Sequence, residues 1–278
     1  MLVAPNIFMF GALFLYQPDV SSYPKSTDYT MRASLKASNF GMNPDFRNRG
    51  EEHTRIETFS DAVFALAVTL LVLSSTVPST FDELQHSFIN VIPFAVCITI
   101  LMVIWYQHYI FFIRYGFKDV NVVAINIILL FLILIYVYPL KFLFTLLFNM
   151  VMAGMAGDSA MFNQIFSNVI EPKDTNVLMV IYGLGAAAVY LVLAWMFYVA
   201  YLRRKAIALN GLEVFHTRTS MYDNMLMASV PLLSAAIAAM NFHSSFFLAG
   251  MTYWLYAVIM PVFHVYRQKR RKKLFGRD

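Results

Sequence analysis

RIETFSDAVFALAVTLLVL, the stretch from Arg55 to Leu73, places the polar side chains of an arginine, a serine and an aspartate in the first turns of a segment that is otherwise mainly apolar. These side chains are Arg55, Ser60 and Asp61. A charged side chain costs about 2.5 to 3.5 kcal/mol at the centre of a membrane-spanning helix, so polar residues there usually have a partner or a task. The stretch therefore predicts the working helix of a membrane protein.

The composition of the whole chain also indicates a membrane protein. Of its 278 residues, 59% are hydrophobic and 13% are charged, which is more apolar than a soluble domain. The net charge of +5 comes from loops and tails and does not indicate binding to nucleic acid. The sequence has no phosphate-binding glycine loop, cysteine pair or Ser-His-Asp order that stands out, so we expect neither an enzyme nor a cofactor.

Six apolar stretches recur along the chain, and all but the fifth, which is the shortest, are long enough to cross ~30 Å of hydrocarbon. Of the 21 Lys and Arg residues, all but Lys141 and Lys173 fall on one side of these stretches. Basic residues favour the cytoplasmic side, so both termini are expected to be cytoplasmic. The sequence predicts an all-α membrane protein with six transmembrane helices per subunit, at Ile56–Val77, Phe88–Ile113, Val120–Leu147, Val177–Leu202, Met225–Met240 and Phe246–Val265.

Three regions follow from this pattern. We expect residues 1–54 to form a flexible N-terminal extension and residues 55–266 to form a six-helix transmembrane domain. Residues 267–278 are expected to form a basic cytoplasmic tail. The tail begins with RQKRRKK, which is expected to fix the topology and to meet anionic lipid headgroups. Residues 148–176 are interpreted as a long loop, and His216 and Arg218 are expected to be solvated in an inner loop.

Helical spacing gives the first segment two different faces. At about 100° per residue, Leu66, Leu70 and Leu73 fall on one stripe with Thr69 at its margin, and the polar residues of the first turns fall well away from it. Such a stripe is usually a lipid-facing or packing surface. In several copies around an axis, it could instead form apolar rings that restrict or gate a pore. Spacing alone does not choose between the two.

Polar side chains on three predicted helices share one layer, roughly 9 to 14 Å below the inner membrane boundary. They are Asp61, Trp105, His108 and Asn126. Trp105 and His108 are three residues apart and so share a helix face. A proton relay or a metal site is conceivable, but one Asp and one His fall short of a metal-ligand set. We favour a hydrogen-bonded packing cluster that braces the first helix.

Three short motifs carry a family resemblance. The first segment opens with R-x-x-x-F-S-D, the second contains W-x-x-H, and the third contains an Asn and a Pro. Together they resemble the motifs of the transmembrane protein 175 family of potassium channels, densely from Arg55 to about Leu147. The matching residues are Arg55, Phe59, Ser60, Asp61, Trp105, His108, Asn126 and Pro139.

The resemblance implies a potassium-permeable cation channel without a TVGYG filter loop. In the prokaryotic type with a single six-helix repeat, it implies a homotetramer with a pore around the first helices. The family's pore positions map to Leu66, Leu70 and Leu73, with a hydroxyl layer at Thr69. The motif residues Arg55, Phe59, Ser60, Asp61, Trp105, His108 and Asn126 are implied to hold the helix rather than to touch the ion.

The partners implied are other copies of the chain, K⁺ and other permeating monovalent cations, and membrane lipids, with no nucleic acid and no bound metal beyond permeating K⁺. A prokaryotic plasma membrane is the expected location. The alternative function is a proton-coupled transporter that uses Asp61 and His108, although no internal repeat with paired broken helices is evident. A membrane-embedded hydrolase would need a nucleophile and a base facing a cavity, for which only scattered Ser and His residues offer candidates.

Overall fold

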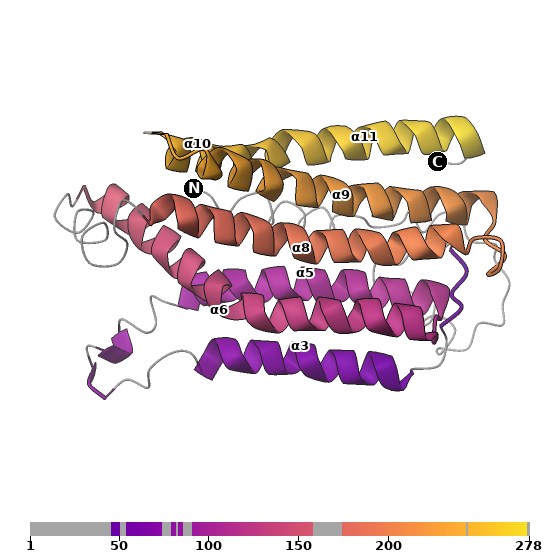
Figure 1. The fold of residues 1–278 in the computed structure, drawn as a ribbon, viewed down its shortest axis with the longest axis horizontal. Helices are drawn as coiled ribbons and strands as arrows, with labels where there is room; N and C mark the ends of the chain where they lie inside the picture. The colour runs from indigo at the N-terminus through magenta and orange to yellow at the C-terminus, as the bar shows by residue number, and fades with distance from the viewer. Residues whose placement is uncertain are drawn as a thin grey trace, which may run out of the picture.

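The computed structural model describes residues 46–50, 54–73, 79–81, 83–85, 91–157, 174–242 and 244–276. The regular elements in these ranges are helices that lie side by side along a common direction (Figure 1). In chain order they are α3 (Arg55–Leu73), α5 (Val91–Tyr115), α6 (Val120–Ala156), α8 (Thr175–Leu202), α9 (Gly211–Ala239), α10 (Ser245–Met251), the 3-10 helix η3 (Thr252–Trp254) and α11 (Leu255–Phe275).

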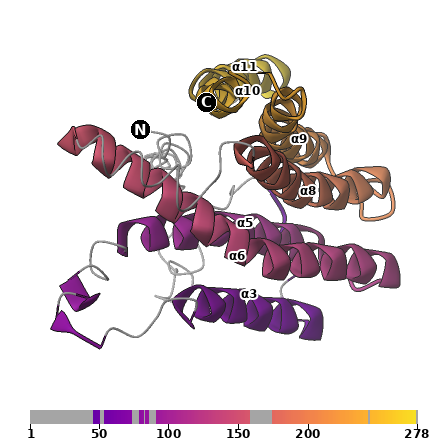
Figure 2. The same cartoon turned by 60° about the vertical axis from the view of Figure 1, so that its left-hand side comes forward.

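The order of packing places α3 at one edge of the bundle and α11 at the other (Figures 1 and 2). Helix α3 packs against α5 and α6, α6 against α8, and α9 against both α8 and α11. One core runs through the bundle and buries Leu71 of α3, Phe111 of α5, Leu129 of α6 and Leu193 of α8. Thus α3 has one face on the core and another directed away from it.

Helices α8 and α9 approach each other closely at Gly183. A Cβ atom placed there would lie 2.6 Å from the backbone oxygen of Pro231 and 2.8 Å from the Cβ of Ala235. Such contact distances require a residue without a side chain, and small residues let membrane helices pack backbone to backbone. Gly183 therefore sets the spacing of this helix pair.

Five segments of the described chain are long and apolar enough to cross a membrane, namely α3, α5, α6 as far as Met155, α8, and Ser245–Phe275. The predicted fifth span, Met225–Met240, corresponds to the second half of α9. Helix α9 has 29 residues, enough length to span, but its first half carries Glu213, Arg218 and Asp223. Helix α9 is not among the five apolar segments, so the predicted number of six is not confirmed.

Several predicted boundaries are wrong. Helix α6 continues to Ala156, so the first part of the predicted 148–176 loop is helical, and residues 158–173 lie outside the described part. Helix α11 continues through the predicted basic tail to Phe275. Pro139 lies inside α6, where a proline removes one backbone hydrogen bond and favours a bend; the half of α6 that follows runs obliquely in Figure 1. Predicted helix positions 74–77 and 88–90 lie outside the described residues.

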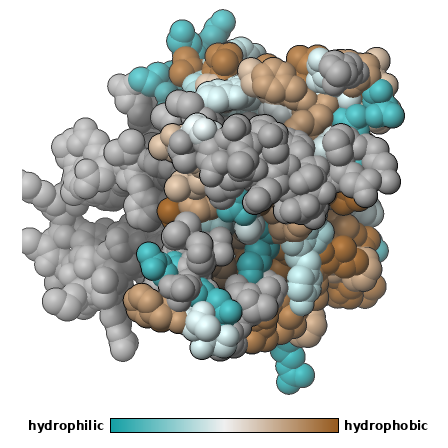
Figure 3. Space-filling view, turned by 90° about the vertical axis from the view of Figure 1, so that its left-hand side faces the viewer, coloured by the Kyte–Doolittle hydropathy of each residue, from teal (hydrophilic) through white to brown (hydrophobic). Residues whose placement is uncertain are grey.

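Large apolar side chains lie on the outer surface of the bundle. Phe131 is 61% exposed, Ile181 52% and Val258 63%, and Figure 3 shows further apolar residues on the right-hand side of the face in view. A soluble monomer rarely exposes so much contiguous apolar surface. The surface therefore suits contact with lipid, and the chain is an integral, multi-pass membrane protein.

Candidate pore-lining helix and its supports

The start of α3 is fixed by a reciprocal cap. The Thr54 hydroxyl accepts a hydrogen bond from the Glu57 backbone N–H at 3.2 Å, and the Glu57 carboxylate accepts one from the Thr54 backbone N–H at 3.2 Å. The Thr54 hydroxyl also donates to that carboxylate at 2.7 Å. This pattern is a capping box, which satisfies two backbone donors that the first turn leaves open. The T-x-x-E spacing of Thr54 and Glu57 is a sequence signal for such a cap, but the predicted helix did not include it.

The leucine stripe of α3 lies on the face turned away from the core. Leu66 is 49% exposed and Leu73 is 72% exposed, whereas Ala67 and Leu71 are fully buried. Thr69 is exposed and Leu70 is half-buried. The Thr69 hydroxyl donates to the Ala65 backbone oxygen at 3.0 Å and so stays within its own helix. No described helix covers Leu66, Thr69 or Leu73, whereas Leu70 at the edge of the stripe packs partly against the core.

The opposite face of α3 carries a buried chain of polar contacts. The Asn126 side-chain amide of α6 donates to the Ser60 hydroxyl at 2.8 Å, and its oxygen lies 2.8 Å from Nε2 of His108 on α5. Ser60 in turn donates to the Ile56 backbone oxygen at 2.8 Å. All three polar side chains are at least 98% buried. The structure thus joins three helices through Ser60, Asn126 and His108.

Asp61 makes a separate contact. Its carboxylate accepts a hydrogen bond from the Trp105 indole N–H at 2.8 Å, and the Trp105 ring stacks on Tyr109 at a centroid distance of 5.7 Å. Asp61 is exposed in the single chain, whereas His108 is buried. Their hydrogen bonds go to different partners, so the two groups of the alternative transporter hypothesis are not directly bonded.

Two of the motif residues, Phe59 and Arg55, lie outside the hydrogen bonds made by Ser60, Asp61, Trp105, His108 and Asn126. Phe59 is 62% exposed, and Arg55 is exposed with no side-chain hydrogen bond or ion pair to the described residues. Both lie at the start of the face that carries the leucine stripe. Their positions thus give no polar bracing contact with the described residues.

A lysine that was not among the predicted site residues supports the other end of α3. The Lys141 ammonium of α6 donates to the Leu71 backbone oxygen at 3.0 Å. The last turn of a helix has backbone oxygens without helical donors, and a lysine there satisfies one and complements the helix dipole. The sequence signal was a single lysine within the apolar α6, which we used only for topology. Helix α3 is therefore held near both ends.

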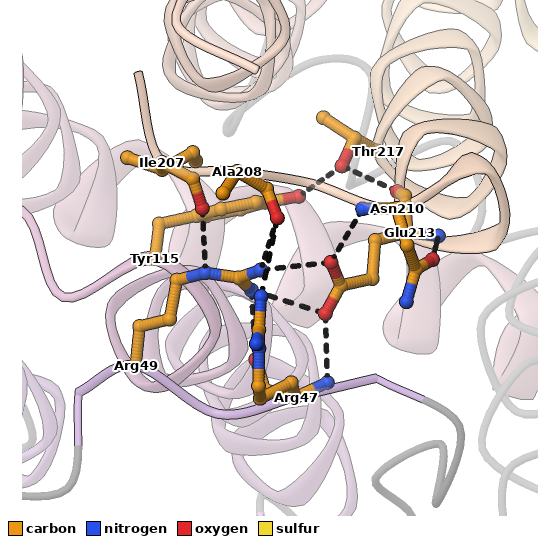
Figure 4. A network of polar contacts seen from close by, with 8 residues as sticks. All are labelled: Arg47, Arg49, Tyr115, Ile207, Ala208, Asn210, Glu213 and Thr217. Atoms are coloured by element: carbon orange, nitrogen blue, oxygen red, sulfur yellow. Dashed lines mark hydrogen bonds and ion pairs between the residues drawn. The ribbon is translucent and has the colours of Figure 1, made fainter. Parts of the chain in front are cut away.

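A second polar cluster lies at the basic end of the bundle, next to the start of α3 (Figure 4). We call residues 46–50 the N-terminal clamp. The Arg49 guanidinium donates to both carboxylate oxygens of Glu213, at 2.8 and 3.1 Å. The Arg49 side chain also donates to the backbone oxygens of Ile207 and Ala208, at 3.0 and 3.3 Å. The clamp thus binds the turn between α8 and α9, although it belongs to the extension that we predicted to be flexible.

Glu213 is fully buried at the centre of this cluster. Besides Arg49, the backbone N–H groups of Arg47 and Asn210 donate to its carboxylate at 3.0 and 2.9 Å. Burial by itself would raise the pKa of Glu213, but the hydrogen bonds from Arg49, Asn210 and Arg47 outweigh it and lower the pKa. Glu213 also completes a capping box with Asn210 at the start of α9. The ionised carboxylate therefore joins the clamp to the turn between α8 and α9 and to the start of α9.

The clamp is also fitted to the end of α5. The backbone N–H groups of Arg49 and Gly50 both donate to the Ile113 oxygen, at 3.1 and 3.0 Å. Phe46 packs edge-to-face on Tyr115 at 5.7 Å. A Cβ atom at Gly50 would lie 2.4 Å from the Phe112 backbone oxygen, so only glycine fits there.

His216 is buried in α9, so the expectation that it is solvated in a loop was wrong. Arg218 also lies in α9 rather than in a loop, but it is exposed.

Within the described ranges, no three His, Cys, Asp or Glu residues are grouped to hold a metal ion. What the arrangement provides is a rigidly held helix with one free, mostly apolar face.

Comparison with known proteins identifies relatives of this chain in sequence and in structure. Residues 55–139 match the family described as endosomal/lysosomal potassium channel TMEM175. A protein of Marivirga tractuosa described as a potassium channel is 47% identical over 242 residues, which cover 84% of this chain and 95% of that protein. The crystal structure of a variant of the potassium channel MtTMEM175, bound to a nanobody fusion protein, superposes with a TM-score of 0.73 at 47% identity, over 82% of this chain and 99% of that one.

Proposed function

This chain belongs to the TMEM175 family of potassium channels, and on that premise we propose that it is a potassium-permeable cation channel with a pore lined by the α3 helices of four copies. The family resemblance found in the sequence motifs is confirmed. The observation that carries the pore proposal is the uncovered face of α3 with Leu66 and Leu73, opposite a face that is braced by polar contacts.

One exposed stripe cannot enclose a path for ions, whereas several copies related by a rotation axis can. Around such an axis, Leu66, Leu70 and Leu73 form successive apolar rings, with the Thr69 hydroxyls between them. A narrow apolar ring resists wetting, so it both restricts and gates ion flow. The rings are the constriction in this proposal, and K⁺ is the ion that the relatives' descriptions indicate.

The bracing contacts give α3 a fixed rotation about its own axis. In its inner half, α3 is held by hydrogen bonds from Asn126 to Ser60 and from Trp105 to Asp61. At its outer end, it is held by the hydrogen bond from Lys141 to the Leu71 backbone oxygen. A rotated helix would direct other side chains to the axis. The role of Ser60, Asp61, Trp105, His108 and Asn126 in the proposal is therefore to aim the leucine rings. We further propose that the basic end of the bundle, with both termini, is cytoplasmic.

Passive potassium flux through proteoliposomes tests the function. The purified full chain should carry K⁺ down its gradient in either direction, without an imposed proton gradient, while protein-free liposomes stay tight. Uptake of K⁺ that occurs only when a proton gradient is imposed would contradict a channel and favour the transporter.

Asn126→Leu tests the bracing contacts. The change keeps the branched shape of the side chain but removes its polar atoms, so Ser60 and His108 lose their shared partner. Interhelical hydrogen bonds in membranes average ~0.6 kcal/mol each, so the loss of two should lower the free energy of unfolding by about 1 kcal/mol and the melting temperature by roughly 2 to 4 °C. Thermal unfolding in detergent measures this. Asn121→Leu, at an exposed position of the same helix, is the control, and equal melting temperatures for the two variants would contradict the bracing role.

A further inference from the structure

A groove runs between the first half of α9 and the last half of α11, at the basic end of the bundle. Helices α9 and α11 lie side by side there (Figure 1). The groove encloses about 420 Å³ and is lined by Gly211, Val214, Phe215, Arg218, Thr219, Tyr222, Phe263, Tyr266, Arg267, Arg270, Leu274 and Phe275. These residues recur every three or four positions on each helix, so each helix contributes one continuous stripe.

Aromatic residues make up five of the twelve that line the groove. Tyr222, Phe263 and Tyr266 line one part of it, and the rings of Phe215 and Phe275 meet at 5.8 Å toward the ends of the two helices. Tyr222 is 41% exposed and Tyr266 is 57% exposed. Aromatic side chains of this kind gather where a membrane protein passes from hydrocarbon to headgroups. The walls therefore suit an amphiphile rather than a soluble ion.

Three arginines line the same groove, and none of its lining residues is acidic. Arg267 is paired with Asp223 at 3.3 Å. Arg218 is exposed, lies 3.5 Å from the Tyr222 hydroxyl and has its guanidinium over the Tyr201 ring. Arg270 is exposed and has no side-chain partner among the described residues. Within the described part of the chain, two guanidinium charges thus lie beside an apolar wall without a carboxylate partner.

We propose that this groove binds an anionic phospholipid, with its phosphate held by Arg218 and Arg270 and its acyl chains against the aromatic wall. Guanidinium groups match phosphate oxygens in bidentate geometry, and basic pockets between membrane helices take anionic headgroups. The lipid joins α9 to α11, whose ion pair in this region is Arg267 with Asp223. This site is distinct from the pore, and its test does not depend on conduction.

Native mass spectrometry of the full chain in detergent, titrated with phosphatidylglycerol or phosphatidylcholine, tests the site. Wild type should bind phosphatidylglycerol more tightly than phosphatidylcholine. The double variant Arg218→Gln/Arg270→Gln should bind phosphatidylglycerol at least about tenfold more weakly, with its phosphatidylcholine binding unchanged. Arg270→Gln alone should show an intermediate loss and provides the readout if the double variant does not fold.

The matched control is Lys269→Gln/Lys273→Gln, which removes the same charge from exposed positions of α11 outside the groove. It should retain wild-type affinity for phosphatidylglycerol. Equal losses in the two double variants would overturn the proposal, because they would indicate diffuse attraction to the basic helix. Wild-type affinity in Arg218→Gln/Arg270→Gln would also overturn it. Displacement of the lipid by an equal concentration of inorganic phosphate would show that the groove takes a free anion instead.

Discussion

Leu66→Asn should raise the single-channel conductance and weaken the preference for K⁺ over Na⁺. Leu66 lies at the centre of the uncovered stripe and is 49% exposed. In the proposed assembly, four amides would replace four leucines and would wet the apolar ring. A barrier lower by about 1 kcal/mol corresponds to a roughly fivefold rise in ion flux. Planar-bilayer recordings under bi-ionic K⁺ and Na⁺ conditions measure both quantities.

Leu191→Asn is the matched control for this variant. Leu191 is 43% exposed on α8, so the chemical change and the exposure are similar, but the residue lies on a helix that lines no pore in the proposal. Its conductance and selectivity should stay at the wild-type values. Unchanged currents from Leu66→Asn, or the same change in both variants, would contradict the assignment of the stripe to the pore.

Arg49→Ala should lower stability more than any other single change considered for this chain. The variant leaves the buried Glu213 carboxylate with only its backbone donors. Breaking a buried ion pair by removing one partner costs about 3 to 5 kcal/mol. We expect the lower end of this range, because two hydrogen bonds to the carboxylate remain. A loss of about 3 kcal/mol corresponds to a fall in melting temperature of roughly 6 to 12 °C.

Arg47→Ala provides the control, since its side chain makes one exposed hydrogen bond to the Ala208 oxygen and its backbone donor to Glu213 is kept. It should change stability by no more than about 0.5 kcal/mol. Melting curves of both variants in detergent give the comparison. A melting temperature for Arg49→Ala equal to that of Arg47→Ala would mean that the clamp does not stabilise the bundle.

The contribution of this ion pair should depend on pH. The pKa of Glu213 is lower in the folded chain than its ordinary value of 4.5. A carboxyl group with a lowered pKa stabilises the folded state fully above the unfolded value, and this contribution is lost as the pH falls through the folded value. The difference in melting temperature between wild type and Arg49→Ala should therefore be full at neutral pH and should shrink below about pH 4.5.

The sequence was most informative about α3 and its nearest partners. The polar residues of the first turns stand out in an apolar segment, and counting depth along antiparallel helices placed Asp61, Trp105, His108 and Asn126 in one layer. The structure links Asp61 with Trp105 and Asn126 with His108. The 3.6-residue period also separated the leucine stripe from the buried face. These features depend on local periodicity and on lengths fixed by the bilayer, both of which can be read from sequence.

The clamp could not be predicted in this way. Arg49 and Glu213 are 164 positions apart, and no periodic pattern connects a polar segment before the first helix with a turn after the fourth. The polar first half of α9 was mistaken for a loop for a related reason. Its charged residues find partners in Arg49 and Arg267, which belong to distant parts of the chain. Ion pairs with distant residues thus allow a polar segment to form a packed helix, although its local sequence resembles a loop.

Covalent modification at position 66 tests most directly whether ions pass along this face of α3. The natural chain has a single cysteine, Cys97, which is buried, so wild type is a suitable control. In Leu66→Cys, a positively charged methanethiosulfonate reagent added during single-channel recording should stop most of the K⁺ current, while wild type and Leu191→Cys should keep theirs. Current in Leu66→Cys that persists after mass spectrometry confirms full modification would contradict a pore lined by α3.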